Sequence, residues 1–146
     1  MDRTQAIVGL SLVGAASMAV VTLFQTGLVS RLPDPPIRGF DSERVNASPI
    51  AYPLGVPDGA LSLASLALNV PVAAALGRRR RPGLARSLAG KAVLEAAVST
   101  WYVWQMPARE RAWCAYCVAG AAATLGIAAL AVGEARPVRR ARRIAA

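Results

Sequence analysis

Four long apolar stretches alternate with shorter polar segments along this chain of 146 residues. The stretches lie at about residues 6–30, 57–77, 84–106 and 113–133. Each is long enough for a helix that crosses a hydrocarbon core, which takes about 20 residues. In lipid, only helices satisfy every backbone polar group of such segments, and the alternation typical of barrel strands is absent. The pattern predicts an all-α protein, with residues 1–146 forming one integral membrane four-helix bundle.

The polar segments predict how the chain turns between these helices. A long proline-rich loop, about residues 31–56, separates the first two helices, whereas short turns at 78–83 and 107–112 join the others. The first apolar stretch, preceded by Arg3, has the order of charge and apolar run found in a signal peptide. Because this run is longer than usual and no persuasive cleavage site follows it, we expect a membrane helix instead.

The net charge of +9 is distributed unevenly between the two predicted sides. With the N-terminus inside, the inner segments hold only the acids Asp2 and Glu134, whereas the outer segments hold five Arg and five acids. The inner basic residues are Arg3, Arg78, Arg79, Arg80, Arg81, Arg86, Arg136, Arg139, Arg140, Arg142 and Arg143. The positive-inside rule therefore predicts both termini in the cytoplasm and the long first loop outside it.

This charge bears on partners and location as well. Basic proteins often bind nucleic acid, but these charges flank membrane stretches, so we expect a lipid bilayer as partner and no nucleic acid. Frequent Arg and Ala with a single Lys are typical of a GC-rich bacterial genome. The expected location is the bacterial inner membrane, with several membrane crossings.

Cys114 and Cys117 form a CxxC motif at the outer end of the fourth stretch. Cysteines three apart in the first turn of a helix share a face, where the free backbone N–H groups and the helix dipole stabilise a thiolate. This placement favours thiol–disulfide exchange on the side where disulfides persist. The alternative is a structural disulfide or two buried thiols, although so short a bridge would stabilise little. Without His or further Cys, no metal site is expected.

The aromatic residues gather in the predicted outer half of the protein. They are Phe24, Phe40, Tyr52, Trp101, Tyr102, Trp104, Trp113 and Tyr116. Trp and Tyr are enriched at membrane interfaces, which accounts for a belt at one surface. A pocket near the cysteines that holds a flat, lipid-soluble ring is a second and compatible interpretation.

Lys91 and Glu95 interrupt the third stretch, which is the weakest of the four. Residues four apart share a helix face, so we expect a mutually neutralising pair that faces the bundle, with Lys91 reaching toward the cytoplasmic side. Charges inside a membrane are costly and often functional. A proton path to a reduced cofactor, or a small transporter that uses Glu95, therefore stays open.

Two segments, residues 45–57 and 114–117, resemble the vitamin K epoxide reductase (VKOR) family. They read Val-Asn-Ala-Ser-Pro-Ile-Ala-Tyr-Pro-Leu-Gly-Val-Pro and Cys-Ala-Tyr-Cys. The resemblance implies a four-helix bundle around a quinone, ubiquinone or menaquinone, with Cys114 and Cys117 as the redox pair and Cys117 closer to the quinone. It also implies that the start of the second helix lines the quinone pocket. The candidate quinone-binding residues are Asp58, Ser48, Tyr116 and Trp113.

One departure from the family concerns the first loop. Typical members carry two further cysteines there, which pass electrons between a thioredoxin-like partner and the membrane pair. The second of them would fall at about Ser42, and a hydroxyl cannot cycle between thiol and disulfide. Either a thioredoxin-like partner reaches Cys114 directly, or another chain supplies the shuttle, or the activity has drifted.

The sequence thus predicts a membrane thiol–disulfide oxidoreductase. It would exchange electrons between an extracytoplasmic dithiol partner and a membrane quinone through the CxxC pair. The alternative is a non-enzymatic, VKOR-like subunit of a larger membrane assembly.

Overall fold

The structure, a computed structural model, describes residues 2–79 and 81–136. Within these ranges it contains helices and turns but no strand, which confirms the all-α class. The α-helices are α1 (Arg3–Gln25), α2 (Ser42–Ala47), α3 (Asp58–Arg78), α4 (Pro82–Gln105) and α5 (Ala115–Ala135). Short turns η1 (Pro49–Ala51) and η2 (Pro53–Gly55) precede α3, and η3 (Met106–Glu110) follows α4.

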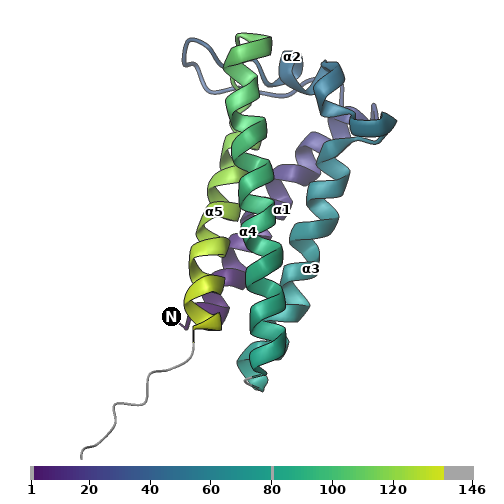
Figure 1. Ribbon diagram of the computed structural model, residues 1–146. Coiled ribbons are helices and arrows are strands. Elements are labelled where there is room, and N and C mark those ends of the chain that lie inside the picture. Colours follow the sequence, from purple (N-terminus) through teal and green to yellow (C-terminus); the bar gives the residue numbers. More distant parts are fainter. Residues whose placement is uncertain (1, 80, 137–146) are drawn as a thin grey trace, which may run out of the picture.

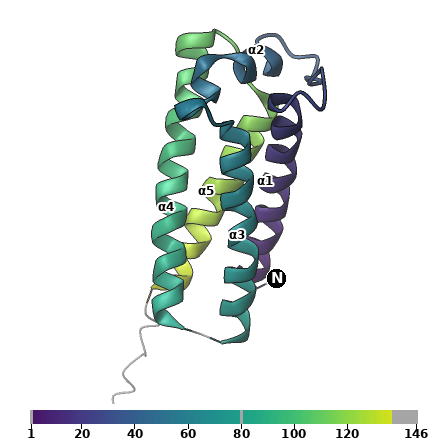
Figure 2. The same ribbon diagram turned by 90° about the vertical axis from the view of Figure 1, so that its right-hand side faces the viewer.

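The long helices α1, α3, α4 and α5 run side by side, with the N-terminus at one end and α2 at the other (Figures 1 and 2). Helix α1 packs extensively against α3 and α5, and α4 packs against α5. Helices α3 and α4 touch each other much less. We call this loosely packed junction the α3–α4 seam.

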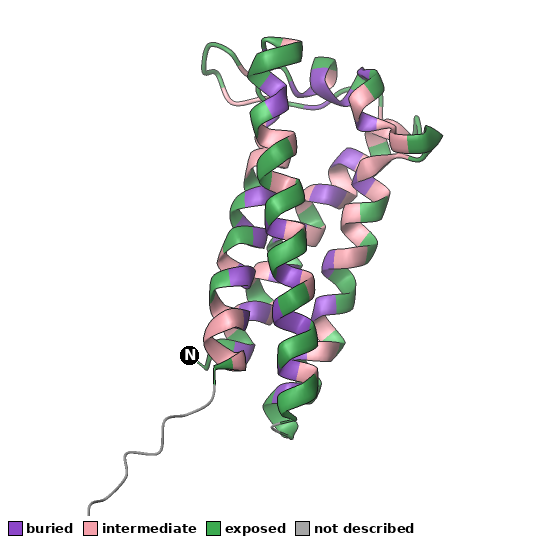
Figure 3. Ribbon diagram, in the orientation of Figure 1, coloured by how far each residue is buried: buried purple, intermediate pink, exposed green. Residues whose placement is uncertain are grey.

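Three of the described helices, α1, α3 and α5, are long and apolar enough to cross a membrane. Helix α4 has a suitable length but is less apolar, because it contains Arg86, Lys91 and Glu95. Large apolar side chains, including Leu12, Leu61 and Leu94, are exposed on the outward faces of the long helices. These faces alternate with a buried inner stripe (Figure 3), an arrangement suited to surrounding lipid.

Local sequence explains where the helices begin and end. Asp2 caps α1 in a reciprocal pair with Gln5, and α1 ends at Gln25 rather than near residue 30. The cause is Gly27, whose φ of 77° suits glycine. The N–H of Gly27 binds the carbonyl of Phe24, while that of Leu28 binds the carbonyl of Leu23. This Schellman motif closes the helix.

The predicted orientation rests partly on residues outside the described ranges. They are Arg80, Arg139, Arg140, Arg142 and Arg143. The described residues Arg3, Arg78, Arg79 and Arg81 lie at the ends of α1, α3 and α4 that are remote from α2.

Candidate redox site

Cys114 and Cys117 are joined by a disulfide at the start of α5, with their Cα atoms 5.2 Å apart. Cys114 is the N-cap residue of α5, and its Sγ accepts a hydrogen bond of 3.1 Å from the backbone N–H of Cys117. Cys114 is fully buried, whereas Cys117 is partly exposed. The pair therefore sits where a helix N-terminus stabilises negative charge on sulfur.

The chain before α5 is tied to the first loop by a short parallel bridge between Phe40 and Trp113. The N–H of Asp41 donates to the carbonyl of Trp113 at 2.9 Å, and the N–H of Trp113 donates to the carbonyl of Gly39 at 2.8 Å. Asp41 is also the N-cap of α2, where its side chain accepts from the N–H of Arg44. These bonds fix α2 directly beside the cysteines.

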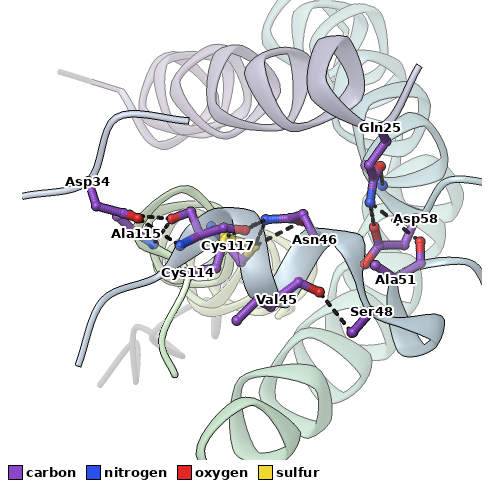
Figure 4. The surroundings of a disulfide bond; sticks show 12 residues. Gln25, Asp34, Val45, Asn46, Ser48, Ala51, Asp58, Cys114, Ala115 and Cys117 are labelled. Atoms are coloured by element: carbon purple, nitrogen blue, oxygen red, sulfur yellow. Dashed lines mark hydrogen bonds between the residues drawn. A yellow bond between two sulfur atoms is a disulfide. The ribbon is translucent and has the colours of Figure 1, made fainter. Parts of the chain in front are cut away.

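Helix α2 covers the disulfide through Asn46 (Figure 4). The Nδ2 group of Asn46 donates to Cys114 Sγ at 3.1 Å and to the carbonyl of Ser42 at 2.8 Å, and it lies 3.7 Å from Cys117 Sγ. Asn46 is almost completely buried. Its amide can therefore stabilise charge on the sulfur of Cys114 when the disulfide opens.

Ser42, the first residue of α2, stands at the position expected for a relay cysteine. It contacts the first residue of α5. Its Oγ accepts from the N–H of Ala115 at 3.0 Å and donates to Asp34 at 2.5 Å. The N–H of Ser42 donates to the other carboxylate oxygen of Asp34 at 2.7 Å. The buried Ser42 is thus held against the residue that follows Cys114 by two hydrogen bonds of its hydroxyl and one of its backbone N–H.

A mostly apolar cavity opens beside Cys117. Its polar lining includes Asn46, Asp58 and Tyr102. The other residues that line it are Met18, Val21, Val45, Ile50, Ala51, Ser62, Leu66, Val98, Ser99, Val103, Met106, Gly120, Ala121 and Thr124. An apolar cavity with a few polar groups beside a redox sulfur fits a quinone ring.

Asp58, the first residue of α3, is bound by Gln25, the last residue of α1. Gln25 Nε2 donates to Asp58 Oδ1 at 2.6 Å, while Gln25 Oε1 accepts from the N–H of Gly59 at 3.1 Å (Figure 4). The side chain of Gln25 thus spans α1 and α3. It fixes the orientation of the carboxylate that lines the cavity.

The other candidate quinone-binding residues lie away from this lining. Ser48 is buried and donates to the carbonyl of Val45 at 2.8 Å. The hydroxyl of Tyr116 donates to the carbonyl of Pro33 at 2.8 Å, and Trp113 forms the bridge to Phe40. A role for these three residues in quinone binding stays a prediction.

Two residues of the site, Asn46 and Gln25, were not candidates from the sequence, whereas Tyr102 was named only as one of the eight aromatic residues. Of the eight aromatic residues, all of which the structure describes, Tyr102 lines the cavity. Asn46 lies one turn after Ser42 on α2, which is the signal that could have pointed to it. Within the described ranges, no cluster of three or more His, Cys, Asp or Glu side chains could hold a metal ion.

The sequence profile of the vitamin K epoxide reductase family matches residues 5–132. The chain belongs to the vitamin K epoxide reductase family. A comparison with curated proteins found no match. Family membership, together with the apolar helices and the cysteine pair, indicates a membrane protein with thiol–disulfide oxidoreductase chemistry. Members of the family use quinones as electron partners.

Proposed function

We propose that this VKOR-family protein is a quinone-linked thiol–disulfide oxidoreductase of the bacterial inner membrane. The observation that carries the proposal is the disulfide at the start of α5, with Cys117 in the wall of an apolar cavity. In this proposal the chain is one domain, α4 is the fourth span, and both termini lie in the cytoplasm. The cysteines then face the oxidising side.

The chemistry divides between the two cysteines. A thiolate of an extracytoplasmic dithiol partner attacks Cys114, and Cys117 leaves as a thiolate beside the cavity. The second partner thiol then releases Cys114, so the partner becomes a disulfide and the pair a dithiol. A bound quinone supplies an acceptor for two electrons and two protons. Asn46 stabilises charge on Cys114 during the exchange, and loss of two electrons from the pair restores the disulfide.

The polar side chains that line the cavity are the candidates for binding a quinone. Asn46, Asp58 and Tyr102 come from three different elements and border one space. Asn46 offers an amide, Tyr102 a hydroxyl and Asp58 a carboxylate that Gln25 orients. The apolar walls exclude water from the sulfur of Cys117.

Reconstitution tests the proposal. The purified protein is mixed with a reduced thioredoxin-like protein and a ubiquinone or menaquinone analogue, and quinone reduction is followed by absorbance. We expect reduction by the native protein and none by Cys117→Ala. Reduction that persists in Cys117→Ala would contradict the mechanism.

Access to Cys114 is the step that this chain must solve differently from relatives with loop cysteines. Cys114 is fully buried beneath α2, so a partner reaches its sulfur only if α2 moves or if a cysteine of another chain enters beside it. Ser42 occupies the adjacent position. We propose that this position is the entry point for the attacking thiol.

A cysteine substitution tests the entry point. In a Cys117→Ala background, Ser42→Cys should form a disulfide with Cys114, detected as the loss of both alkylatable thiols in the intact mass. Ser48→Cys is the matched control, because Ser48 is also buried but bonds to Val45 at the far end of α2. Equal bridging by both variants, or by neither, would exclude Ser42 as the entry point.

The buried Cys114 also favours a second candidate, a non-enzymatic subunit of a larger membrane assembly. In that case a stoichiometric partner should co-purify. A strain with both cysteines changed to Ala should then grow like the native strain. Impaired growth of that strain would favour the oxidoreductase.

A further inference from the structure

Two rows of polar side chains line the α3–α4 seam. The rows are Asp58, Ser62, Ser65 and Asn69 on α3, and Lys91, Glu95, Ser99 and Tyr102 on α4. Their members are three or four residues apart, so each row occupies one helix face. The rows meet directly, because Lys91 Nζ donates to the carbonyl of Ser65 at 2.9 Å and to Asn69 Oδ1 at 2.8 Å.

The ion pair at the inner part of these rows is incompletely satisfied. Lys91 Nζ lies 2.6 Å from Glu95 Oε1, which also accepts from the hydroxyl of Ser65. Glu95 Oε2 and Asn69 Nδ2 are buried, and within the described residues they have no hydrogen-bond partner. Such atoms are rare, and a bound water or proton is a common explanation. One oxygen of the Glu95 carboxylate is therefore not engaged by the ion pair and is available to a water molecule or a proton.

A second cavity, lined in part by Glu95, adjoins the cavity beside Cys117. It has a volume of about 270 Å³ and is lined by Glu95 and Ser65. The two cavities share the hydroxyl-bearing residues Ser62, Ser99 and Thr124. Hydroxyl groups both donate and accept, so with intervening water they can pass protons between the two spaces.

We propose that Glu95 is the proton-exchanging carboxyl of the quinone cavity, acting through Ser62 and Ser99. The inference rests on the proposed function, in which the cysteine dithiol loses two electrons and two protons as its disulfide forms. The electrons and two protons are taken up at the quinone. Glu95 hands on protons that water in the seam replaces, and the thiol protons are released to water, so no other reactant is needed.

The other titratable groups around the seam show how the position of Glu95 differs from theirs. Lys91 faces it on the same helix, while Asp58 and Tyr102 stand at the other end of the rows and line the cysteine cavity. The chain contains no His. On the side away from Asp58, the cores of α3 and α4 are apolar, with Ala73, Leu76 and Leu88 buried. Glu95 is thus the innermost acid of the two rows.

Chemical labelling tests the proton on Glu95 without quinone or partner. A lipid-soluble carbodiimide reacts with protonated carboxyl groups in membrane segments. We expect Glu95 to be labelled in the native protein, with the peptide identified by mass spectrometry, and no label at this position in Glu95→Gln. A Glu95 that stays unlabelled across the pH range of the folded protein would overturn the proposal.

Kinetics then separate proton transfer from a structural ion pair. In Glu95→Gln, the quinone step should slow by about 100-fold and lose its pH dependence, while exchange with the dithiol partner keeps its rate. Glu95→Asp should restore part of the rate. The double variant Lys91→Met/Glu95→Gln removes the unpaired lysine and should fold, yet remain slow. A native rate in the double variant would show that the pair is only structural.

The same measurements distinguish a failure of the proposed function from a failure of the proposed role of Glu95. A native protein that exchanges thiols with the partner but reduces no quinone overturns the proposed function. A native protein that reduces quinone, and a Glu95→Gln protein that does so equally fast, overturn only the role of Glu95.

Discussion

The α1–α5 interface and the α3–α4 seam are built from similar helices but packed in opposite ways. At the α1–α5 interface, a Cβ atom at Gly14 would lie only 3.2 Å from Ala123 Cβ, and one at Gly120 would lie 2.8 Å from Met18 Cε. Small residues there allow close backbone approach between the two helices. At the seam, polar side chains and two adjoining cavities separate the helices.

This difference separates a closely packed part of the protein from a part that has room for a ligand. Close packing leaves no room for a ligand and gains stability from many small contacts. Cavities forgo those contacts, and charges in a membrane are costly, so both are expected where a ligand or proton must enter. The seam and the cysteines meet at the cavity beside Cys117, which Asp58 and Tyr102 of the polar rows also line.

The largest effect is expected from enlarging a residue in the closely packed interface. Gly14→Leu should destabilise the protein by about 3 kcal/mol, because its side chain would overlap Leu66 and Ala123. Thermal unfolding in detergent measures the change. Gly90→Leu on α4 is the control, since nothing lies within 4 Å of a Cβ there and the substitution gains helix propensity. A similar loss in both variants would mean that the interface is no tighter than the rest.

The same kind of enlargement at the seam should change ligand binding instead of folding. Ser62→Leu projects into the space that both cavities share, so stability should change by less than about 1.5 kcal/mol. Affinity for a short-tailed quinone, measured by calorimetry, should fall at least about tenfold, or 1.4 kcal/mol. Ser17→Leu on α1, which is partly exposed and lines neither cavity, should leave the affinity unchanged. Unaltered binding in Ser62→Leu would remove the seam from the binding site.

The long helices could be predicted from the sequence because each follows from a local apolar run, and the position of the cysteines at the start of α5 follows from the same runs. The end of α1 was missed because a short Schellman closure at Gly27 overrides a continuing apolar pattern. The contact of Asn46 with Cys114 joins residues 68 positions apart. No local pattern specifies such a contact, and the six-residue α2 sits in a proline-rich loop.

The polar rows of the seam could be predicted in part from the sequence. The spacing of Lys91 and Glu95 placed them on one helix face, as the hydrogen bonds between α3 and α4 now show. Their partners could not be predicted, because the sequence does not state which helix faces which. Ser65 and Asn69 have the same spacing on α3, and only the packing of α3 beside α4 joins the two rows.

An effect of similar size is expected at the end of the cavity, where Asn46 contacts sulfur. Asn46→Ala removes a hydrogen bond to the Cys114 thiolate of the reduced pair, and bonds to charged groups contribute about 1.5–3 kcal/mol. The equilibrium with glutathione should therefore shift about tenfold or more toward the disulfide. Redox titration measures this shift. Asn69→Ala, which removes an equally buried amide without a sulfur contact, should leave it unchanged. Equal shifts in both variants would argue against a role for Asn46.

The smallest effect is expected at the opposite end of the α1–α5 interface, where a polar contact replaces glycine packing. Arg3 donates from Nη1 to the carbonyl of Gly133 at 3.0 Å, close to the C-terminus of α5. A cation at this end of a helix is favoured by the helix dipole, but this contact is exposed. Arg3→Gln should therefore lower stability by less than about 1 kcal/mol, and this loss should shrink as salt is added. A loss comparable to that of Gly14→Leu would mean that the charged contact, and not the close approach of small residues, holds α1 to α5.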